Sequence, residues 1–567
     1  MRWTKVKQFF PITVIICISL VFRFIYLNRI PAALSGDELH YILTAKSVWL
    51  TGHDISGTWN LFSALFFRYP PGEGQAELPY FLHLPFSGPF PFSLFLAKLP
   101  FALLSVGIVI LLYKIASKLF GKTIGIATGL IAAVNPWLVV MGRTGYESTP
   151  ATFFYLLAIW VLLSTHSWGI LWSLIPFSLA FYSYIGTKLI FIPFVILAIF
   201  LTKYKQKNLN MKPYVALGLL CMAITIGFFI LLKTSPGESR ITEIMLPSSQ
   251  TVANQVNEMR RASVQSPLLP FLINKYTAYI QIISSKLLRI FSPTYLFLEG
   301  DQFFLPAKQS FFYYIDFLFL IWGTLWFFSK KPQVFLILTG FIFIGTFPHL
   351  FHTTMGDFSA HIALMFPFMI MLIGAGIAQL HRRPILAGIT VIFYILSIAS
   401  FSMIYFFQYP LTGSSDFPMR ILFKYVSLAK QSQIPITIYS TRSEDALTKY
   451  LFYTNEFTKE SIKEISHIEK GLPFTFHRIH FTDCNSDVTR DNAPSGILIY
   501  DQICAMRIDG QTVKISGLVD GGQKYTILND SVCSGYKLNT YPAGIRISDF
   551  RIEQLSQENF CKTFISR

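Results

Sequence analysis

Residues 213–232 read PYVALGLLCMAITIGFFILL, a run of 20 residues without one charged side chain. An α-helix rises about 1.5 Å per residue, so a run of about 20 apolar residues can cross the roughly 30 Å hydrocarbon core of a bilayer. An apolar run of that length is typical of a transmembrane helix, so it predicts a membrane protein.

Ten further apolar runs extend the same pattern over the first 410 residues. We predict them as spans at 11–29, 94–113, 123–141, 150–165, 169–185, 188–202, 311–328, 333–350, 359–380 and 385–408. The composition agrees, with 53% hydrophobic and 14% charged residues, against about a quarter charged in an average soluble protein. The predicted fold class is mainly α: a polytopic membrane protein of about 11 transmembrane helices with a small C-terminal α/β domain.

The distribution of charge predicts the orientation. Residues 411–567 hold 18 basic and 17 acidic residues, so the first 410 residues carry +16 of the net charge of +17. That excess is scattered between apolar runs, unlike the single basic surface of a nucleic-acid binder. With the N-terminus in the cytoplasm, the cytoplasmic loops collect fourteen Lys and Arg and no Asp or Glu, as the positive-inside rule requires. We therefore expect a multi-pass protein of the cell (plasma) membrane with its C-terminus outside.

The first run has a second interpretation. The small residues at 31–35 resemble the cleavage site of a signal peptide. The length of the run, and its direct continuation into a polar motif, favour a span instead.

The polar segments define the domains. Residues 1–410 are predicted as a transmembrane catalytic domain with outer loops at about 31–93 and 233–310. Within the second loop, residues 271–295 mix basic, aromatic and aliphatic side chains, which favours helices lying on the membrane surface. Residues 411–567 are predicted as an extracytoplasmic α/β domain, with strands near 434–439 and 496–500 and a helix at 444–453.

Four of the six cysteines lie in this tail: Cys484, Cys504, Cys533 and Cys561. None has the close spacing of a zinc site. We predict two disulfides, which suits an extracytoplasmic domain, with free thiols as the alternative. Three pairings are open, and the sequence does not choose among them.

Candidate catalytic residues follow the first span. Asp37 and Glu38 come directly before a return to apolar residues, so they lie on a segment that resembles a buried one. Arg143 and Glu147 supply a second set, four residues apart and on one helical face if a helix begins there. Solvated carboxylates and a local ion pair are the alternatives for the two sets.

Two further outer sets contain polar residues. Tyr182 and Tyr184 fit an aromatic belt, but Lys188 puts a positive charge on the side where positive charges are avoided. The other set comprises His349, His352, Asp357 and His361, which are interface residues or ligands of a metal or phosphate.

The order of these motifs is specific. The acidic pair follows the first span, and Asn135-Pro136-Trp137 then leads to Arg143 and Glu147, with Tyr182 and Tyr184 before Lys188 and the loop 297–301 before a later span. Over about residues 30–370 the chain resembles the GT-C superfamily of membrane glycosyltransferases. It is most similar to the protein O-mannosyltransferase and aminoarabinose transferase families and their prokaryotic branch.

The resemblance implies a transferase that uses a polyprenyl-phosphate-linked sugar on the outer face of the membrane. It assigns the first-loop acid to Asp37, with Glu38 beside it, and a second acid to Glu147. It assigns a cation near the lipid phosphate to Arg143. The chain departs from the families where His361 precedes Pro367, because relatives often carry Arg there.

The remaining site assignments follow from this resemblance. Tyr182, Tyr184, Lys188 and His361 are predicted to contact the lipid phosphate or the sugar. Glu147 stands where Asp is common in the relatives. The zinc site of aminoarabinose transferases is not carried over, because Glu73 and Glu77 align too loosely.

The chemistry agrees with these residue types. A carboxylate can deprotonate the acceptor hydroxyl as a general base, and Arg or Lys can stabilise the departing phosphate. No cofactor is required, and a divalent metal stays open without a clear ligand set. The expected partners are a polyprenyl-phosphate sugar, a protein, lipid or glycan acceptor, and membrane lipid, but no nucleic acid.

The alternative function is a multi-span transporter or lipid flippase of cell-envelope precursors. Such a protein is expected to show repeated halves and broken midplane helices, and neither is evident. Oligosaccharyltransferases share the superfamily, but their Trp-Trp-Asp-Tyr-Gly signature is absent from the tail.

Overall fold

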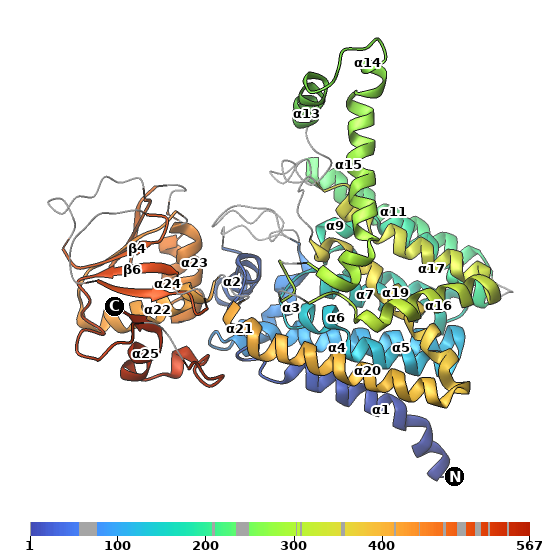
Figure 1. Cartoon of the computed structure of the whole chain (residues 1–567), viewed down its shortest axis with the longest axis horizontal. Helices are drawn as coiled ribbons and strands as arrows, with labels where there is room; N and C mark the ends of the chain where they lie inside the picture. Colours follow the sequence, from blue (N-terminus) through green and yellow to red (C-terminus); the bar gives the residue numbers. More distant parts are fainter. Residues whose placement is uncertain are drawn as a thin grey trace. The chain divides into compact units, whose positions relative to one another are not determined.

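A computed structural model gives the structure of the chain (Figure 1). It describes residues 2–55, 76–206, 210–233, 249–301, 303–306, 309–352, 358–412, 416–441, 443–465, 467–468, 472–484, 495–504, 512–519, 522–540 and 544–567. The chain forms two compact units, which are described separately. Unit 1 comprises Met1–Ile25, Phe101–Gly142 and Tyr146–Phe401, and unit 2 comprises Tyr26–Pro100, Arg143–Gly145 and Ser402–Arg567.

Long apolar helices make up most of unit 1. The predicted runs fall on α1 (Arg2–Phe24), α4 (Leu94–Phe120), α5 (Lys122–Val134), α6 (Pro136–Met141), α7 (Ser148–Ser164), α8 (Leu174–Phe181), α10 (Phe191–Lys205), α11 (Lys212–Lys233), α16 (Tyr314–Lys330), α17 (Pro332–Ile344), α19 (Phe366–Ala378) and α20 (Pro384–Met403). The mainly helical fold is therefore confirmed.

Five helical segments of the described chain are long and apolar enough to cross a membrane. They are Leu94–Phe120, Lys212–Ile230, Pro332–Leu350, Ser359–Arg382 and Pro384–Leu411. The count of eleven spans stays a prediction.

Glycines let α16 and α19 pack backbone to backbone. A Cβ at Gly323 would lie 1.8 Å from the carbonyl oxygen of Leu372, and one at Gly376 would lie 2.2 Å from that of Phe319. Small residues at such contacts are the usual means by which helices associate where the surrounding lipid is as apolar as the side chains.

The Asn135-Pro136-Trp137 motif breaks one predicted run into two helices. Pro136 has no N–H and begins α6, while the side chain of Asn135 accepts a hydrogen bond from Leu138 N at 3.0 Å. The same amide donates to the carbonyl of Phe311 at 2.9 Å. The motif thus ends one helix, starts the next and ties both to a distant segment of unit 1.

The second outer loop contains α13 (Ser249–Arg261), α14 (Leu269–Leu272) and α15 (Lys275–Ile290). Figure 1 shows α15 extending away from the other helices of the unit, with α13 and α14 near its far end. The apolar side chains of Leu268, Phe271 and Leu272 are exposed there. The predicted helical character of residues 271–295 is confirmed, and their position on the membrane surface stays a prediction.

The tail in unit 2 contains a mixed seven-stranded sheet in the order β2-β3-β1-β4-β6-β5-β7. Its strands are β1 (Ile436–Tyr439), β2 (Phe474–Phe476), β3 (Ile479–Thr482), β4 (Ile497–Asp501), β5 (Thr512–Ser516), β6 (Gln523–Leu528) and β7 (Ile565–Ser566). Strand β1 runs parallel to both neighbours, with Ile436 opposite Ile479 and Ile497. The α/β character predicted from the runs at 434–439 and 496–500 is confirmed.

Helices of the tail and of the first outer loop share one core. The tail contributes α22 (Phe417–Ala429), α23 (Ser443–Thr454), α24 (Lys459–Ile465) and α25 (Gln557–Phe564), and the loop contributes α2 (Gly36–Thr51). Helix α3 (Leu78–Ser87) of the loop packs against α2 in a separate small cluster, through Tyr80 and Tyr41. Leu39, Ile42 and Leu43 of α2 belong to the same buried cluster as Leu447 and Tyr450 of α23. The acid-bearing helix α2 is therefore anchored by the tail, while the domain boundary at residue 410 stays a prediction.

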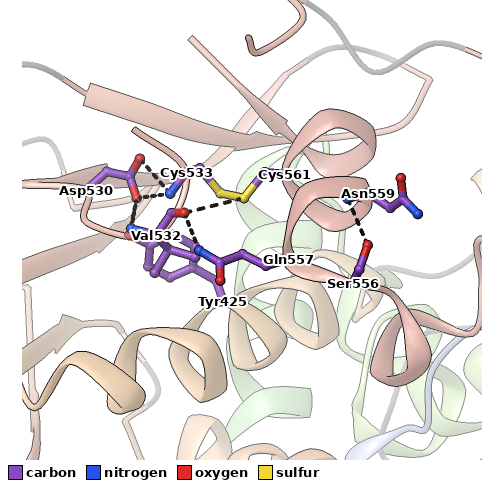
Figure 2. The surroundings of a disulfide bond; sticks show 8 residues. All are labelled: Tyr425, Asp530, Val532, Cys533, Ser556, Gln557, Asn559 and Cys561. Carbon is purple, nitrogen blue, oxygen red and sulfur yellow. Dashed lines mark hydrogen bonds between the residues drawn. A yellow bond between two sulfur atoms is a disulfide. The ribbon is translucent and has the colours of Figure 1, made fainter. Parts of the chain in front are cut away.

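Both predicted disulfides form in the tail, as Cys484–Cys504 and Cys533–Cys561. Their Cα atoms lie 5.0 and 5.5 Å apart, within the usual range. Figure 2 shows Asp530 beside the second bridge, where its carboxylate accepts a hydrogen bond from Cys533 N at 2.9 Å. The prediction of paired cysteines is confirmed.

Removal of the Cys533–Cys561 bridge should destabilise the tail. The bridge closes a loop across 28 residues, and a loop of that size is worth about 3.6 kcal/mol through the entropy of the unfolded chain. We expect the Cys533→Ala/Cys561→Ala protein to lose about that much unfolding free energy, measured by denaturant unfolding. An unchanged unfolding midpoint would contradict this expectation.

Candidate active site

The predicted acidic pair lies in the first turn of α2. Ser35 caps the helix, because its Oγ accepts a hydrogen bond from Glu38 N at 3.4 Å while the Glu38 carboxylate accepts one from Ser35 N at 2.8 Å. This reciprocal capping box, and the negative charges at a helix N-terminus, explain why the chain turns into a helix at this point. Asp37 is exposed, whereas Glu38 is 4% exposed.

Glu38 connects the acidic pair to the loop that contains Arg143. Its other oxygen, Oε1, accepts a hydrogen bond from Gly145 N at 2.5 Å. Only glycine fits there, since a Cβ at Gly145 would lie 2.8 Å from Glu38 Cγ. The structure thus brings the acidic pair against the loop that contains Arg143, and both segments belong to unit 2.

Asp37 and Glu38 differ in burial, and this affects the pKa of Glu38. Burial raises the pKa of the Glu38 carboxyl above its ordinary value, while hydrogen bonds from Ser35 and Gly145 and the positive charge of Lys98 oppose the rise. The carboxylate of Glu38 is therefore used in hydrogen bonds within the protein. Asp37 is the member of the pair that solvent reaches.

Positive charge is concentrated beside these acids. Arg143 is 0% exposed, donates from Nη2 to the carbonyl of Ile30 at 3.0 Å, and lies over the rings of Tyr405 and Phe406 at 5.5 and 5.3 Å. Lys98, in the first turns of α4, is also 0% exposed and donates to the carbonyl of Pro31. A buried charge of this kind is costly unless it is paired or used.

Two of the cations in this region, Lys98 and Arg420, were not predicted from the sequence. Lys98 interrupts the predicted run at 94–113 near its outer end, and a charge in such a place is a signal that could have singled it out. Arg420 in α22 carries no comparable signal, because an Arg on an amphipathic helix is ordinary in sequence. Its fully buried position follows only from the three-dimensional fold.

A second group of predicted residues meets in unit 1. Lys188 lies over the ring of Phe228 at 4.2 Å and over that of Tyr182 at 5.7 Å. The rings of Tyr184 and His361 lie 6.1 Å apart. Lys188 and Tyr182, and separately Tyr184 and His361, are thus brought together within the unit. The contact of these four residues with the lipid phosphate or the sugar stays a prediction.

Three histidines of this region also gather. His352 and His361 have ring centroids 4.4 Å apart, and His349 and His361 have theirs 6.2 Å apart. Lys286 of α15 donates to the carbonyl of His352 at 2.6 Å. Asp357, named with these histidines in the sequence, lies outside the described residues.

One geometric expectation is wrong. Helix α7 begins at Ser148 with Glu147 as its N-cap residue, and the segment from Arg143 to Gly145 is not helical. Arg143 and Glu147 therefore do not share a helical face. The turn at Gly145 separates them, because this residue must approach Glu38 closely. From the sequence we also expect Glu147 and Asp37 to converge on one cavity at the outer membrane boundary. This stays a prediction, since the two residues belong to different units.

The metal expectation stays open as well. Within the described ranges, no group of three or more His, Cys, Asp or Glu side chains is arranged to hold a metal ion. Glu73 lies outside those ranges.

A cavity of unit 2 lies elsewhere in the unit. It has a volume of about 310 Å³ and is lined by Phe92, Phe452, Tyr453 and the ion pair of Arg420 with Glu553, among others. Neither Asp37 nor Glu38 lines it. Asp37 and Glu38 therefore lie outside this cavity.

The comparisons with known proteins agree with the fold and the resemblance. Residues 87–230 match the family model described as dolichyl-phosphate-mannose-protein mannosyltransferase. No curated protein sequence matches the chain.

Three solved structures are similar to this chain. ArnT from Cupriavidus metallidurans bound to undecaprenyl phosphate is 12% identical, with a TM-score of 0.50, over 93% of this chain and 99% of that chain. The apo form of ArnT is 12% identical with a TM-score of 0.48, over 91% and 97% of the two chains.

A third similar structure is the oligosaccharyltransferase AglB from Archaeoglobus fulgidus, in complex with an inhibitory peptide and a dolichol-phosphate. It is 11% identical, with a TM-score of 0.47, over 80% of this chain. The present chain spans 64% of the length of that protein.

The long apolar helices indicate a multi-pass membrane protein, and its fold and its matched segment are similar to those of GT-C glycosyltransferases. The similarity to the dolichyl-phosphate-mannose-protein mannosyltransferase family rests on residues 87–230. The resemblance predicted from the ordered motifs is therefore confirmed.

Proposed function

We propose that this protein transfers a sugar from a polyprenyl-phosphate-linked donor to an acceptor hydroxyl on the outer face of the membrane, with Asp37 as the general base. The observation that carries the proposal is the cluster at the start of α2. An exposed Asp37 there adjoins a buried Glu38, which is bonded to the Arg143 loop and lies near the buried Lys98. The family match and the undecaprenyl phosphate bound to ArnT support the choice of donor.

The side chains of this cluster can accept the proton and stabilise the leaving group of the proposed reaction. The acceptor oxygen forms a bond to C1 of the sugar as the bond from C1 to the phosphate oxygen breaks. Asp37 takes the hydroxyl proton, and the bonding electrons leave with the polyprenyl phosphate. That leaving group needs positive charge rather than a proton, and Arg143 and Lys98 supply it from a buried position.

The other predicted residues have supporting roles in the proposal. Glu38 holds the Arg143 loop against the start of α2. Glu147 is proposed as a second acid, and Lys188, Tyr182, Tyr184 and His361 are proposed as contacts of the lipid phosphate or the sugar. No cofactor takes part in this scheme. The acceptor is a protein, a lipid or a glycan.

The proposal also requires a defined topology, with eleven spans, a cytoplasmic N-terminus and the tail outside. Reporter enzymes fused after Arg567 test it, because some are active only in the cytoplasm and others only outside. We expect activity only from the reporter that works outside. A C-terminal reporter active in the cytoplasm would contradict the topology and the assignment of Asp37 to the outer face.

Mass spectrometry of surface glycans tests the function in cells. Cells that lack this protein should lose one sugar from one class of surface acceptor, and the wild-type gene should restore it, whereas Asp37→Asn should not. Identical glycan profiles with and without the protein would contradict the proposal.

A further inference from the structure

Residues 30–32 form a short strap between the first span and α2. Three consecutive carbonyl groups of this strap each accept a hydrogen bond from a different buried cation. Arg143 donates to Ile30, Lys98 donates to Pro31, and Arg420 donates to Ala32 at 2.6 Å. All of these residues belong to unit 2.

The cations come from three separate segments. Arg143 follows α6, Lys98 lies in α4, and Arg420 lies in α22 of the tail, 388 residues from its partner in the strap. Arg143 and Lys98 are 0% exposed and Arg420 is 2% exposed. Three buried charges on one stretch of backbone leave it little freedom, because moving any carbonyl would strip a buried cation of a hydrogen bond.

Arg420 is itself held rigidly. Its Nε and Nη2 atoms donate to the two carboxylate oxygens of Glu553, both at 2.7 Å, and Nη2 also donates to the carbonyl of Phe550 at 2.9 Å. This is the two-pronged geometry that favours Arg over Lys. Burial alone would raise the pKa of Glu553, but the adjacent Arg420 charge lowers it below its ordinary value, so the pair stays ionised at neutral pH.

The tail makes a second contact just beyond the strap. The hydroxyl of Tyr453 in α23 accepts a hydrogen bond from Leu34 N at 3.2 Å, and Tyr453 lies beneath the Arg420 guanidinium at 5.9 Å. The capping residue Ser35 and Asp37 follow at once. The backbone that leads into the acid-bearing turn is therefore fixed by two residues of the tail.

We infer that Arg420 is a positioning residue for glycosyl transfer, through which the tail sets the place of Asp37. This inference rests on the proposed function. Arg420 acts through the backbone of the strap and does not touch donor. A general base must lie within hydrogen-bond reach of the acceptor hydroxyl, and a displacement of about 1 Å can lower a rate about a hundredfold.

The test compares turnover with donor affinity in the full-length protein. Arg420→Ala should lower kcat by about tenfold to a hundredfold, while the KM for the polyprenyl-phosphate sugar stays within about twofold. Arg420→Lys should recover part of kcat, because an ammonium group can still reach the carbonyl of Ala32 but cannot form both bonds to Glu553.

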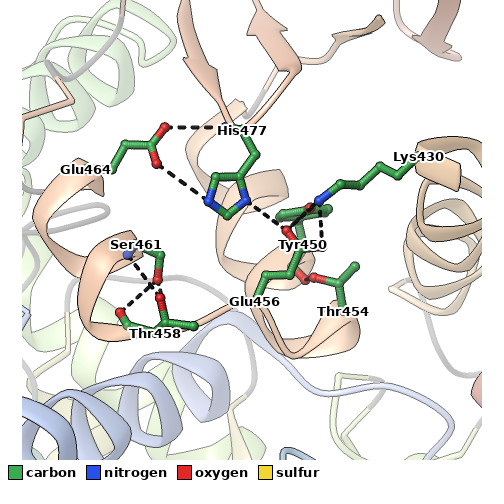
Figure 3. Close-up of polar contacts among 8 residues, drawn as sticks. All are labelled: Lys430, Tyr450, Thr454, Glu456, Thr458, Ser461, Glu464 and His477. Carbon is green, nitrogen blue, oxygen red and sulfur yellow. Dashed lines mark hydrogen bonds and ion pairs between the residues drawn. The ribbon is translucent and has the colours of Figure 1, made fainter. Parts of the chain in front are cut away.

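A matched control uses another ion pair of the tail. Figure 3 shows Lys430, which donates to Glu456 at 2.6 Å beside Tyr450 and His477. Lys430→Ala breaks a partly buried pair in the same domain without contacting the strap. It should lower the melting temperature of the tail but leave kcat unchanged. An equal loss of kcat in both variants would reduce Arg420 to a purely structural role and overturn the inference.

Hydrogen–deuterium exchange separates this inference from the proposed function. Peptides that cover residues 30–39 should exchange faster in Arg420→Ala than in the wild type or Lys430→Ala. Faster exchange in a protein with no transferase activity would support the strap and contradict the function. Unchanged exchange together with normal kcat in Arg420→Ala would overturn the inference and leave the function standing.

Discussion

Transfer by the Asp37→Asn protein should fall by about 10² to 10⁴-fold. Asparagine keeps the shape of the side chain but has no carboxylate to accept the proton of the attacking hydroxyl. Asp37 is exposed in the first turn of α2, while the capping hydrogen bonds are made by Ser35 and Glu38. The helix should therefore form normally. Donor binding should also survive, because the predicted phosphate contacts are cationic.

The measurement is the rate of sugar transfer under single-turnover conditions, with donor affinity determined separately. Glu444→Gln is the matched control, because it removes a first-turn acid from α23 in the same unit. It reports the effect of losing a negative charge at a helix N-terminus, which is worth less than about 1 kcal/mol. Near-normal transfer by Asp37→Asn would show that another group is the base.

Arg143→Ala should weaken donor binding as well as turnover. A hydrogen bond to a charged group is worth about 1.5–3 kcal/mol, which corresponds to a change of about 10 to 150-fold in affinity. Arg143 is buried beside the acidic pair and lies over two aromatic rings, so its charge is poorly screened there. Direct binding of the polyprenyl phosphate without its sugar is the measurement that isolates this effect.

Arg23→Ala supplies the control for loss of a buried arginine. Arg23 is 0% exposed and donates to the carbonyl of Ala133 at 2.7 Å and to Ser105 Oγ at 2.8 Å within unit 1. Its removal should destabilise the helices without a specific loss of lipid-phosphate affinity. Equal affinities for polyprenyl phosphate in Arg143→Ala and wild type would contradict the role of Arg143.

The helices and the tail were predictable from local sequence for a physical reason. A span needs about 20 apolar residues, and the strands at 436–439 and 497–501 are short apolar runs that contain β-branched residues. These signals lie within single segments. The pairing of Cys484 with Cys504 and of Cys533 with Cys561 was not predictable, because it depends on how the sheet brings distant loops together.

The candidate site was predictable only in part. The ordered motifs identified Asp37, Glu38 and Arg143, and the structure brings Glu38 against the Arg143 loop. The capping role of Glu38 carries a local signal, because Ser35 and Glu38 have the spacing of a capping box. Its hydrogen bond to Gly145 has no such signal, because it depends on the packing of distant segments. Arg420 was missed for the same reason, since its partner in the strap is 388 residues away.

Sugar transfer can be measured with the purified protein in liposomes, supplied with a labelled polyprenyl-phosphate sugar and an extract of envelope acceptors. We expect the wild type to release polyprenyl phosphate and to move the label to an acceptor in equal amounts, while Asp37→Asn binds the donor and leaves it intact. A folded wild-type protein that binds the donor but never cleaves it would rule out the proposed transfer. An Asp37→Asn protein that cleaves the donor at the wild-type rate would rule out Asp37 as the base.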